Sequence, residues 1–194
     1  MAKAARRLGA AIMAGLWVAT TPGLAAEAVV VVGIDDAGCG AFPSELEAAK
    51  TEASRTYSLI GVSLVWTGKG TKTIGPSAGA FDVTVALMSR ARTDTFLLPR
   101  RFSSTALGVA PSGTRRIYVF CGRIRQRAFE MNEKAETILG RVIAHELGHL
   151  LLPGNGHSAT GIMRASLDYK TTEEPLRFTE AEANAILAFL TSSR

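Results

Sequence analysis

The most constraining feature of this sequence is the position of its histidines. The chain has three histidines in 194 residues, and all lie between positions 145 and 157, in the segment HELGHLLLPGNGH. His145 and His149 are four residues apart, so on a helix both imidazoles lie on one face and can reach a single ion. Glu146 completes the pattern H-E-x-x-H, in which the carboxylate can act as general base on zinc-bound water. With His157 after a glycine-rich turn, the segment offers the three protein ligands of a catalytic zinc site.

The surrounding residues predict a buried helix that stops shortly before His157. Apolar side chains recur at the spacing of one broad helical stripe: Ile138, Leu139, Val142, Ile143, Leu147, Leu150 and Leu151. Polar rings within such a stripe need partners when they are buried, and a metal ion would supply one. The segment Pro153-Gly154-Asn155-Gly156 cannot continue a helix. We therefore expect the helix to run past Leu150, and Gly154 or Gly156 to take a positive φ angle and make the turn.

The stretch from residue 145 to residue 163 resembles the signature of the metzincin clan of zinc endopeptidases. That signature is H-E-x-x-H-x-x-G-x-x-H, followed by a turn that contains a methionine. The resemblance implies that His145, His149 and His157 are the zinc ligands. It also implies that Glu146 is the catalytic base and that Met163 is the Met-turn residue beneath the ion.

The resemblance is closest to the matrixins after the third histidine, and it is weaker before it. Ser158 directly follows that histidine, and the gap to Met163 is short, as in matrixins. Seven residues separate the second and third histidines, where the family pattern has five. Leu152 stands where the family has glycine. Gly154 instead lies three residues before the third histidine, which is the position of the family's glycine relative to that histidine. A two-residue insertion before the turn accounts for both departures.

Two other ligand sets are open from the sequence. A glutamate could replace the third histidine, as in thermolysin-like enzymes. The downstream candidates are Glu173, Glu174, Glu180 and Glu182. The first two precede a proline, and the other two lie where acidic residues cap a helix. Alternatively, His157 stays in solvent and the site holds two histidines and water.

Residues 1–26 have the organisation of a signal peptide. Lys3, Arg6 and Arg7 form a positive end, the apolar run 8–19 follows, and small residues at 23–28 offer cleavage sites. The run is too short to span a bilayer. We therefore expect a secreted or periplasmic protein with no membrane span after signal removal.

The charge of the chain gives no reason to expect a nucleic-acid partner. Loss of the three signal-peptide cations lowers the formal net charge from +5 to +2. The remaining arginines gather in one region, which we interpret as the solvated face of a strand and its exit loop: Arg115, Arg116, Arg123, Arg125 and Arg127.

Residues 27–194 are expected to form one zinc metalloprotease domain of the α+β class. We predict strands at 28–36, 62–66, 81–88, 106–110 and 115–121, helices at 44–58, 136–151 and 179–190, and a polar loop at 91–104. The first strand–helix–strand unit implies a parallel pair. This order resembles the metzincin catalytic domain, with a twisted mixed sheet of four to five strands, an active-site helix and a C-terminal helix. The resemblance also implies that residues 107–111 form an edge strand that borders the cleft and pairs with extended substrate.

The two cysteines, Cys39 and Cys121, suit a disulfide in an exported protein. The rival interpretation is a Cys39 thiolate that caps the zinc, as in latent matrixins. The residues around Cys39 do not match the inhibitory segment of that family.

The sequence thus predicts a secreted zinc-dependent endopeptidase that binds one Zn²⁺ and acts as a monomer on peptide or protein substrates. An external inhibitor is one means by which its activity could be controlled. The alternative is a non-catalytic zinc-containing binding or adhesion domain on the same fold. Glu146 favours the enzyme, because hydrolysis needs a base and metal binding does not.

Overall fold

The computed structural model describes residues 28–40, 43–68, 80–97, 103, 105–152, 154, 156–166 and 176–192. The predicted signal peptide and the candidate ligands Glu173 and Glu174 lie outside these residues. None of the described helices is long and apolar enough to cross a membrane.

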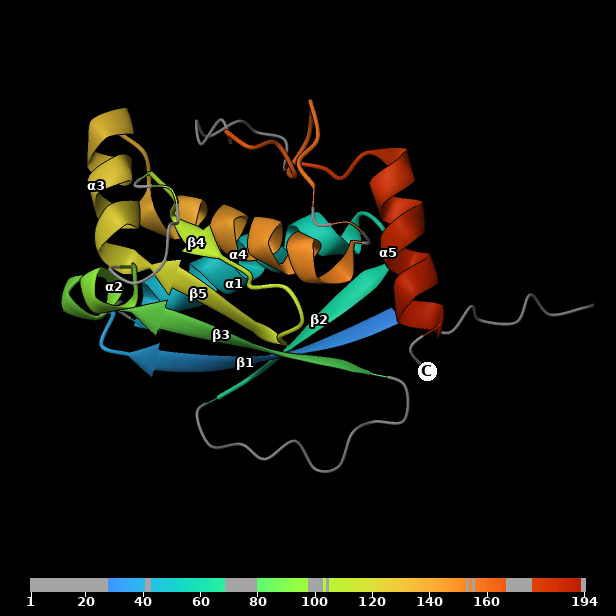
Figure 1. The fold of residues 1–194 in the computed structure, drawn as a ribbon, viewed down its shortest axis with the longest axis horizontal. Coiled ribbons are helices and arrows are strands. Elements are labelled where there is room, and N and C mark those ends of the chain that lie inside the picture. The colour runs from blue at the N-terminus through green and yellow to red at the C-terminus, as the bar shows by residue number, and fades with distance from the viewer. Residues whose placement is uncertain are drawn as a thin grey trace, which may run out of the picture.

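A five-stranded sheet forms the centre of the molecule (Figure 1). Its strands are β1 (Ala28–Ala37), β2 (Val62–Thr67), β3 (Phe81–Met88), β4 (Gly108–Val109) and β5 (Arg116–Phe120), in the spatial order β2-β1-β3-β5-β4. The first four strands in this order are parallel, and β4 pairs antiparallel with β5 at one edge. The valine run in β1 is buried on both faces, as expected for a central parallel strand. The predicted parallel pairing of the first two strands is confirmed, and so is the edge position of the short strand.

Helices cover one face of this sheet and both of its ends. They are α1 (Pro43–Ser58), α2 (Arg90–Leu97), α3 (Cys121–Met131), α4 (Ala135–Leu151) and α5 (Glu180–Ser192). Helices α1 and α4 pack side by side along the same face, while α2 and α3 lie at one end and α5 at the other (Figure 1). The fold is therefore mixed α/β with a mostly parallel sheet, in agreement with the α+β class at this coarse level.

The predicted loop at 91–104 is wrong in its first half, because Arg90–Leu97 forms helix α2. Ser89 caps this helix: its carbonyl accepts the backbone N–H of Thr93 at 2.9 Å, and its hydroxyl lies 3.4 Å from the backbone nitrogen of Arg92. The buried Thr93 hydroxyl also donates to the Ser89 carbonyl, at 2.9 Å. This short helix has one capping residue and one buried side chain, so hydrophobic periodicity gave no sign of it.

The predicted strand 115–121 is also too long, because helix α3 begins at Cys121. Arg123, Arg125 and Arg127 therefore lie on a helix and not in a strand's exit loop. Buried Cys121, Ile124 and Ala128 form the inner face of this helix. Asn132 ends it in a left-handed conformation with a φ of 53°.

A disulfide joins Cys39, just after β1, to Cys121 at the start of α3. Both residues are buried. The bond ties the end of the central strand to the helix that precedes α4, and it leaves no Cys39 thiolate to cap a metal.

Candidate metal centre

Helix α4 carries both histidines of the H-E-x-x-H pattern, and α1 holds it in place. The Tyr57 hydroxyl on α1 donates to the Ala144 carbonyl at 3.1 Å, one residue before the first histidine. One turn earlier, Arg141 Nε lies 3.1 Å from Glu52 Oε1, and the Arg141 side chain is only 2% exposed. Buried polar groups of this kind need specific partners. These contacts therefore fix the rotation of α4 and the direction of its histidines.

His145 is buried, and its ring orientation is fixed by a backbone carbonyl. Its Nδ1 lies 2.7 Å from the Ile162 carbonyl oxygen, so Nδ1–H is the donor and Nε2 is left as the metal-binding atom. His149 Nε2 lies 3.1 Å from His145 Nε2. Burial lowers the pKa of His145, aided by the charge of His157, against smaller raising effects of the Ile162 bond and the Glu182 charge. A lowered pKa favours the neutral imidazole, which is the form that binds metal.

The turn to the third histidine follows the prediction. Helix α4 runs to Leu151, and Leu152 ends it in an extended conformation while its N–H donates to the Gly148 carbonyl at 2.9 Å. Gly154 then takes a φ of 88°. The His157 ring comes to lie with its centroid 5.4 Å from that of the first histidine and 4.9 Å from that of the second.

Together the three histidines could hold a metal ion. Each offers a ring nitrogen, and these three atoms lie within 4.8 Å of one another. His145 is buried, His149 is half-buried and His157 is exposed, so the group is open to solvent on one side. Three imidazoles with an open side are a donor set that suits a divalent transition metal.

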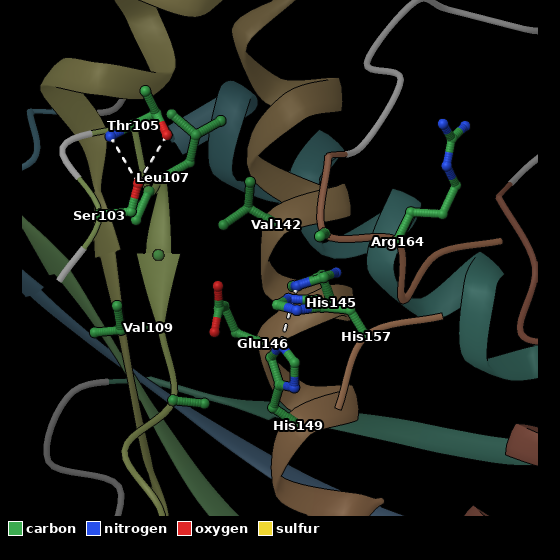
Figure 2. Close-up of a pocket in the computed structure, with 14 residues that line it drawn as sticks. Ser103, Thr105, Leu107, Val109, Val142, His145, Glu146, His149, His157 and Arg164 are labelled. Carbon is green, nitrogen blue, oxygen red and sulfur yellow. Dashed lines mark hydrogen bonds between the residues drawn. The ribbon is translucent and has the colours of Figure 1, made fainter. Parts of the chain in front are cut away.

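Glu146 lies between the histidines and the edge strand β4 (Figure 2). Its carboxyl group is buried, and burial raises its pKa to about 8 in spite of a backbone hydrogen bond at Ala110 that lowers it. A Cβ placed on Gly108 would lie 2.9 Å from Glu146 Cγ. The edge strand therefore needs glycine at this position to pass so close to the carboxylate.

Met163 packs beneath the site and is fully buried. A Cβ built on Gly148, the residue before the second histidine, would collide with the Met163 sulfur. The Met163 carbonyl accepts the backbone N–H of Ser158 at 2.9 Å. The methionine turn is thus joined both to α4 and to the residue after His157.

A cavity of about 380 Å³ extends from the histidines along β4 (Figure 2). Its walls come from the segment before β4, from β4 itself, from α4 and from the methionine turn. The lining residues are Ser103, Thr105, Ala106, Leu107, Gly108, Val109, Ala110, Val142, His145, Glu146, His149, His157, Arg164 and Ala165. The cavity opens beside the three histidine nitrogens that could hold a metal ion.

Two residues near the site have roles that the sequence did not suggest. Arg123, interpreted as part of a solvated face, donates through Nη1 to the carbonyls of Ser103 and Ala106 at 3.3 Å and 2.8 Å, and so holds the rim of the cavity. Glu182, a candidate ligand, is absent from the metal-binding group of the described residues. It accepts hydrogen bonds from Ser158 and from the Thr179 backbone instead. From the sequence, Glu182 could be recognised only as part of a helix-capping box with Thr179, in which each residue accepts a backbone N–H of the other.

In comparisons with known proteins, no family model matches the chain and no curated protein matches it either. The geometry of the site is therefore the basis for the function proposed below.

Proposed function

We propose that this protein is a zinc-dependent endopeptidase of the metzincin type. The observation that carries the proposal is the convergence of three histidine nitrogens, within 4.8 Å of one another, beside a buried glutamate and an edge strand in one cavity. Two histidines four residues apart on a helix occur in many proteins. A third histidine and a general base at the same point are what hydrolysis needs in addition.

Zinc is the metal that we propose for this donor set, because three imidazoles and one open position match a catalytic zinc site. Nitrogen ligands about 2.0–2.1 Å from a tetrahedral zinc ion lie about 3.3 Å apart, close to the 3.1 Å between the two Nε2 atoms on α4. His145, His149 and His157 would hold the ion and leave one position open. When bound, the ion supplies Lewis acidity, which lowers the pKa of water and polarises the scissile carbonyl.

Glu146 would act as the general base and then as the proton donor. Its carboxylate would take a proton from the attacking water and deliver it to the nitrogen of the leaving amine. Burial raises the pKa of Glu146 to about 8 without a metal. A dication nearby favours the charged carboxylate and lowers that pKa, so metal binding would prepare the base.

The edge strand β4 is the surface on which we expect substrate to bind. Strand β5 pairs with one side of β4, at Gly108 and Val109, and the cavity with the histidines opens along β4. An extended peptide on this edge would gain backbone hydrogen bonds that accept many sequences. The cavity beside Leu107 and Val142 would select among side chains.

The arrangement of elements supports the metzincin assignment. The mostly parallel sheet, the short antiparallel strand at the cleft, the helix with the histidines, the methionine turn and the final helix follow the order that the resemblance implies. The longer turn between the second and third histidines would be a feature of this chain.

We further propose that the protein is secreted or periplasmic. The disulfide between Cys39 and Cys121 supports export, because such bonds persist in oxidising compartments. The proposed substrate is a peptide or protein. An external inhibitor and restriction to an extracytoplasmic target are the two means of control that we propose.

The test is peptide cleavage that depends on metal. Purified protein is incubated with a peptide library, with and without a chelator, and the products are identified by mass spectrometry. We expect internal peptide bonds to be cut, chelator to abolish cleavage, and added zinc to restore it. Zinc bound at one ion per chain without any cleavage would favour the alternative of a non-catalytic zinc-containing binding domain.

A further inference from the structure

The buried carboxylate of Glu182 has no part in the proposed mechanism, yet it lies beside the metal site. It is in the first turn of α5 and is only 8% exposed. Oε2 accepts the Thr179 backbone N–H at 2.7 Å, and the Thr179 hydroxyl accepts the Glu182 N–H at 3.3 Å. These two bonds form a capping box. A cap alone needs only one of the carboxylate oxygens, and the second oxygen has another partner.

That partner is Ser158, the residue directly after the third histidine. The Ser158 hydroxyl donates to Glu182 Oε1. The Ser158 backbone is held as well, since its N–H donates to the Met163 carbonyl at 2.9 Å and it forms a parallel bridge with Arg164. Ser158 is therefore fixed to the methionine turn by its backbone and to α5 by its side chain.

The two described glycines before His157 face open space. A Cβ placed on Gly154 or on Gly156 would meet no described atom within 4 Å. His157 itself is exposed. Within the part of the chain that is described, the hydrogen bonds of Ser158 therefore tie the third histidine to the methionine turn and to α5.

The start of α5 is a firm anchor for this contact. Phe178, which precedes the capping box, is buried and packs edge-on against Tyr57 with ring centroids 5.0 Å apart. Tyr57 is the residue whose hydroxyl binds the Ala144 carbonyl on α4. The Arg177 carbonyl accepts the N–H of Ile162 at 2.9 Å. The contact between Phe178 and Tyr57 thus connects the start of α5, which binds Ser158, to α4, which carries the other two histidines.

We propose that Glu182 is a positioning residue for the third metal ligand, acting through Ser158. This inference rests on the proposed zinc site. The bond between the two side chains holds His157 with its ring nitrogen facing the histidines of α4. Metal binding then costs little further conformational entropy, because the third ligand is already in place. Glu182 therefore slows zinc loss without touching the metal. Removal of such outer contacts typically weakens metal affinity about 10–100-fold.

A matched pair of variants separates this role from capping. Ser158→Ala removes the contact between the histidine turn and α5 but leaves the capping box intact. Thr179→Ala removes the capping hydroxyl, but the backbone N–H that Glu182 accepts stays. Zinc affinity is measured by competition with a chelator, the zinc dissociation rate by transfer to excess chelator, and the melting temperature on metal-free protein.

We expect Ser158→Ala to bind zinc about 10–100-fold more weakly and to release it faster, while its metal-free melting temperature falls by an amount similar to that of Thr179→Ala, because each variant removes one hydrogen bond to Glu182. Thr179→Ala should lower the metal-free melting temperature and leave zinc affinity unchanged. Glu182→Gln keeps the size of the side chain and should weaken zinc binding, and Glu180→Gln in the same turn is its control.

Unchanged zinc affinity and release rate in Ser158→Ala, with a wild-type protein that binds one zinc, would overturn the positioning role and leave the proposed function standing. Equal effects of Ser158→Ala and Thr179→Ala on zinc would also overturn it, because capping alone would then explain them. A wild-type protein that binds no zinc would remove the proposed function together with this inference.

Discussion

The proposed zinc site has two halves that are held in different ways. His145 and His149 belong to α4, a helix whose turns are hydrogen-bonded and whose inner face is buried. His157 lies on an exposed turn that follows Gly154, and its place depends on contacts from the methionine turn and from α5. The first half is ordered by the hydrogen bonds of its own helix and by contacts with α1. The second half is ordered by the nearby methionine turn and by Glu182, which lies 24 positions from Ser158. A site of this kind can lose its third ligand while the fold and the first two ligands remain.

The largest effect is expected on the rate of peptide hydrolysis, in a variant that removes the catalytic base but leaves both halves of the zinc site in place. Glu146→Gln keeps the size of the side chain and should leave zinc bound at one ion per chain. Peptide hydrolysis should fall about 10²–10⁴-fold, because the amide cannot accept the proton of water. Initial rates and zinc content are measured on the same preparation. Wild-type rates in this variant would remove Glu146 from the mechanism.

The helix-borne half can be weakened through Arg141. The Arg141 side chain is 2% exposed and its partner Glu52 is 15% exposed, so Arg141→Met would leave a mostly buried carboxylate without its ion pair. We expect a loss of about 3–5 kcal/mol in the free energy of unfolding, measured by denaturant titration.

The matched control for Arg141 is Arg127→Met. Arg127 lies 3.5 Å from Glu130 on the surface, and both side chains are well exposed. Its loss should cost less than about 1 kcal/mol. Similar losses in the two variants would mean that the buried pair does not hold α4.

Gly108→Ala tests the contact between the edge strand and the base. The added methyl group would lie 2.9 Å from Glu146 Cγ and 3.0 Å from a Val142 methyl group, so one of the elements must shift. We expect a loss of about 1–3 kcal/mol in stability and slower peptide hydrolysis, with zinc still bound.

Gly122→Ala serves as the control for this variant, because its nearest neighbour would be an Arg90 carbon at 3.4 Å and the residue is helical. It should be neutral or slightly stabilising. Full activity in Gly108→Ala would show that the strand does not position the base.

The smallest effect is expected at the contact that joins the two halves. Met163 fills the space against Gly148 and is fully buried. Met163→Leu conserves volume and should cost less than about 1.5 kcal/mol in thermal or denaturant unfolding, with zinc content unchanged. Loss of zinc in this variant would mean that the methionine does more than pack.

The helix-borne half could be predicted from the sequence because its evidence is local. The spacing of His145 and His149, the apolar stripe and the helix-ending glycines all act within a few residues of one another. The sheet could be outlined for the same reason, since the β1 valine run and the alternation in β3 are local signals. The disulfide partners could be named because the chain has only two cysteines, but the sequence also left open a Cys39 thiolate that caps the zinc.

The missed elements had weak or misleading local signals. Helix α2 has a single capping serine and a polar sequence, and α3 starts directly from a strand without a capping side chain. Two signals in the sequence could have revealed α3. Cys121, Ile124 and Ala128 have the spacing of one helical face, and Asn132 is a residue type that often ends a helix in a left-handed conformation. The link from Glu182 to Ser158 had no sequence signal, because it joins residues 24 positions apart that only the fold brings together.

The most direct test of the two-part site is a crystal structure of the zinc-loaded protein. The turn before His157 is two residues longer than in the metzincin pattern that the sequence resembles, and we propose that it still brings the third ligand to the ion. We expect nitrogens of His145, His149 and His157 to bind the zinc, each at about 2.0–2.1 Å. Zinc held by the two helix-borne histidines alone, with the His157 ring beyond coordinating distance, would contradict this proposal.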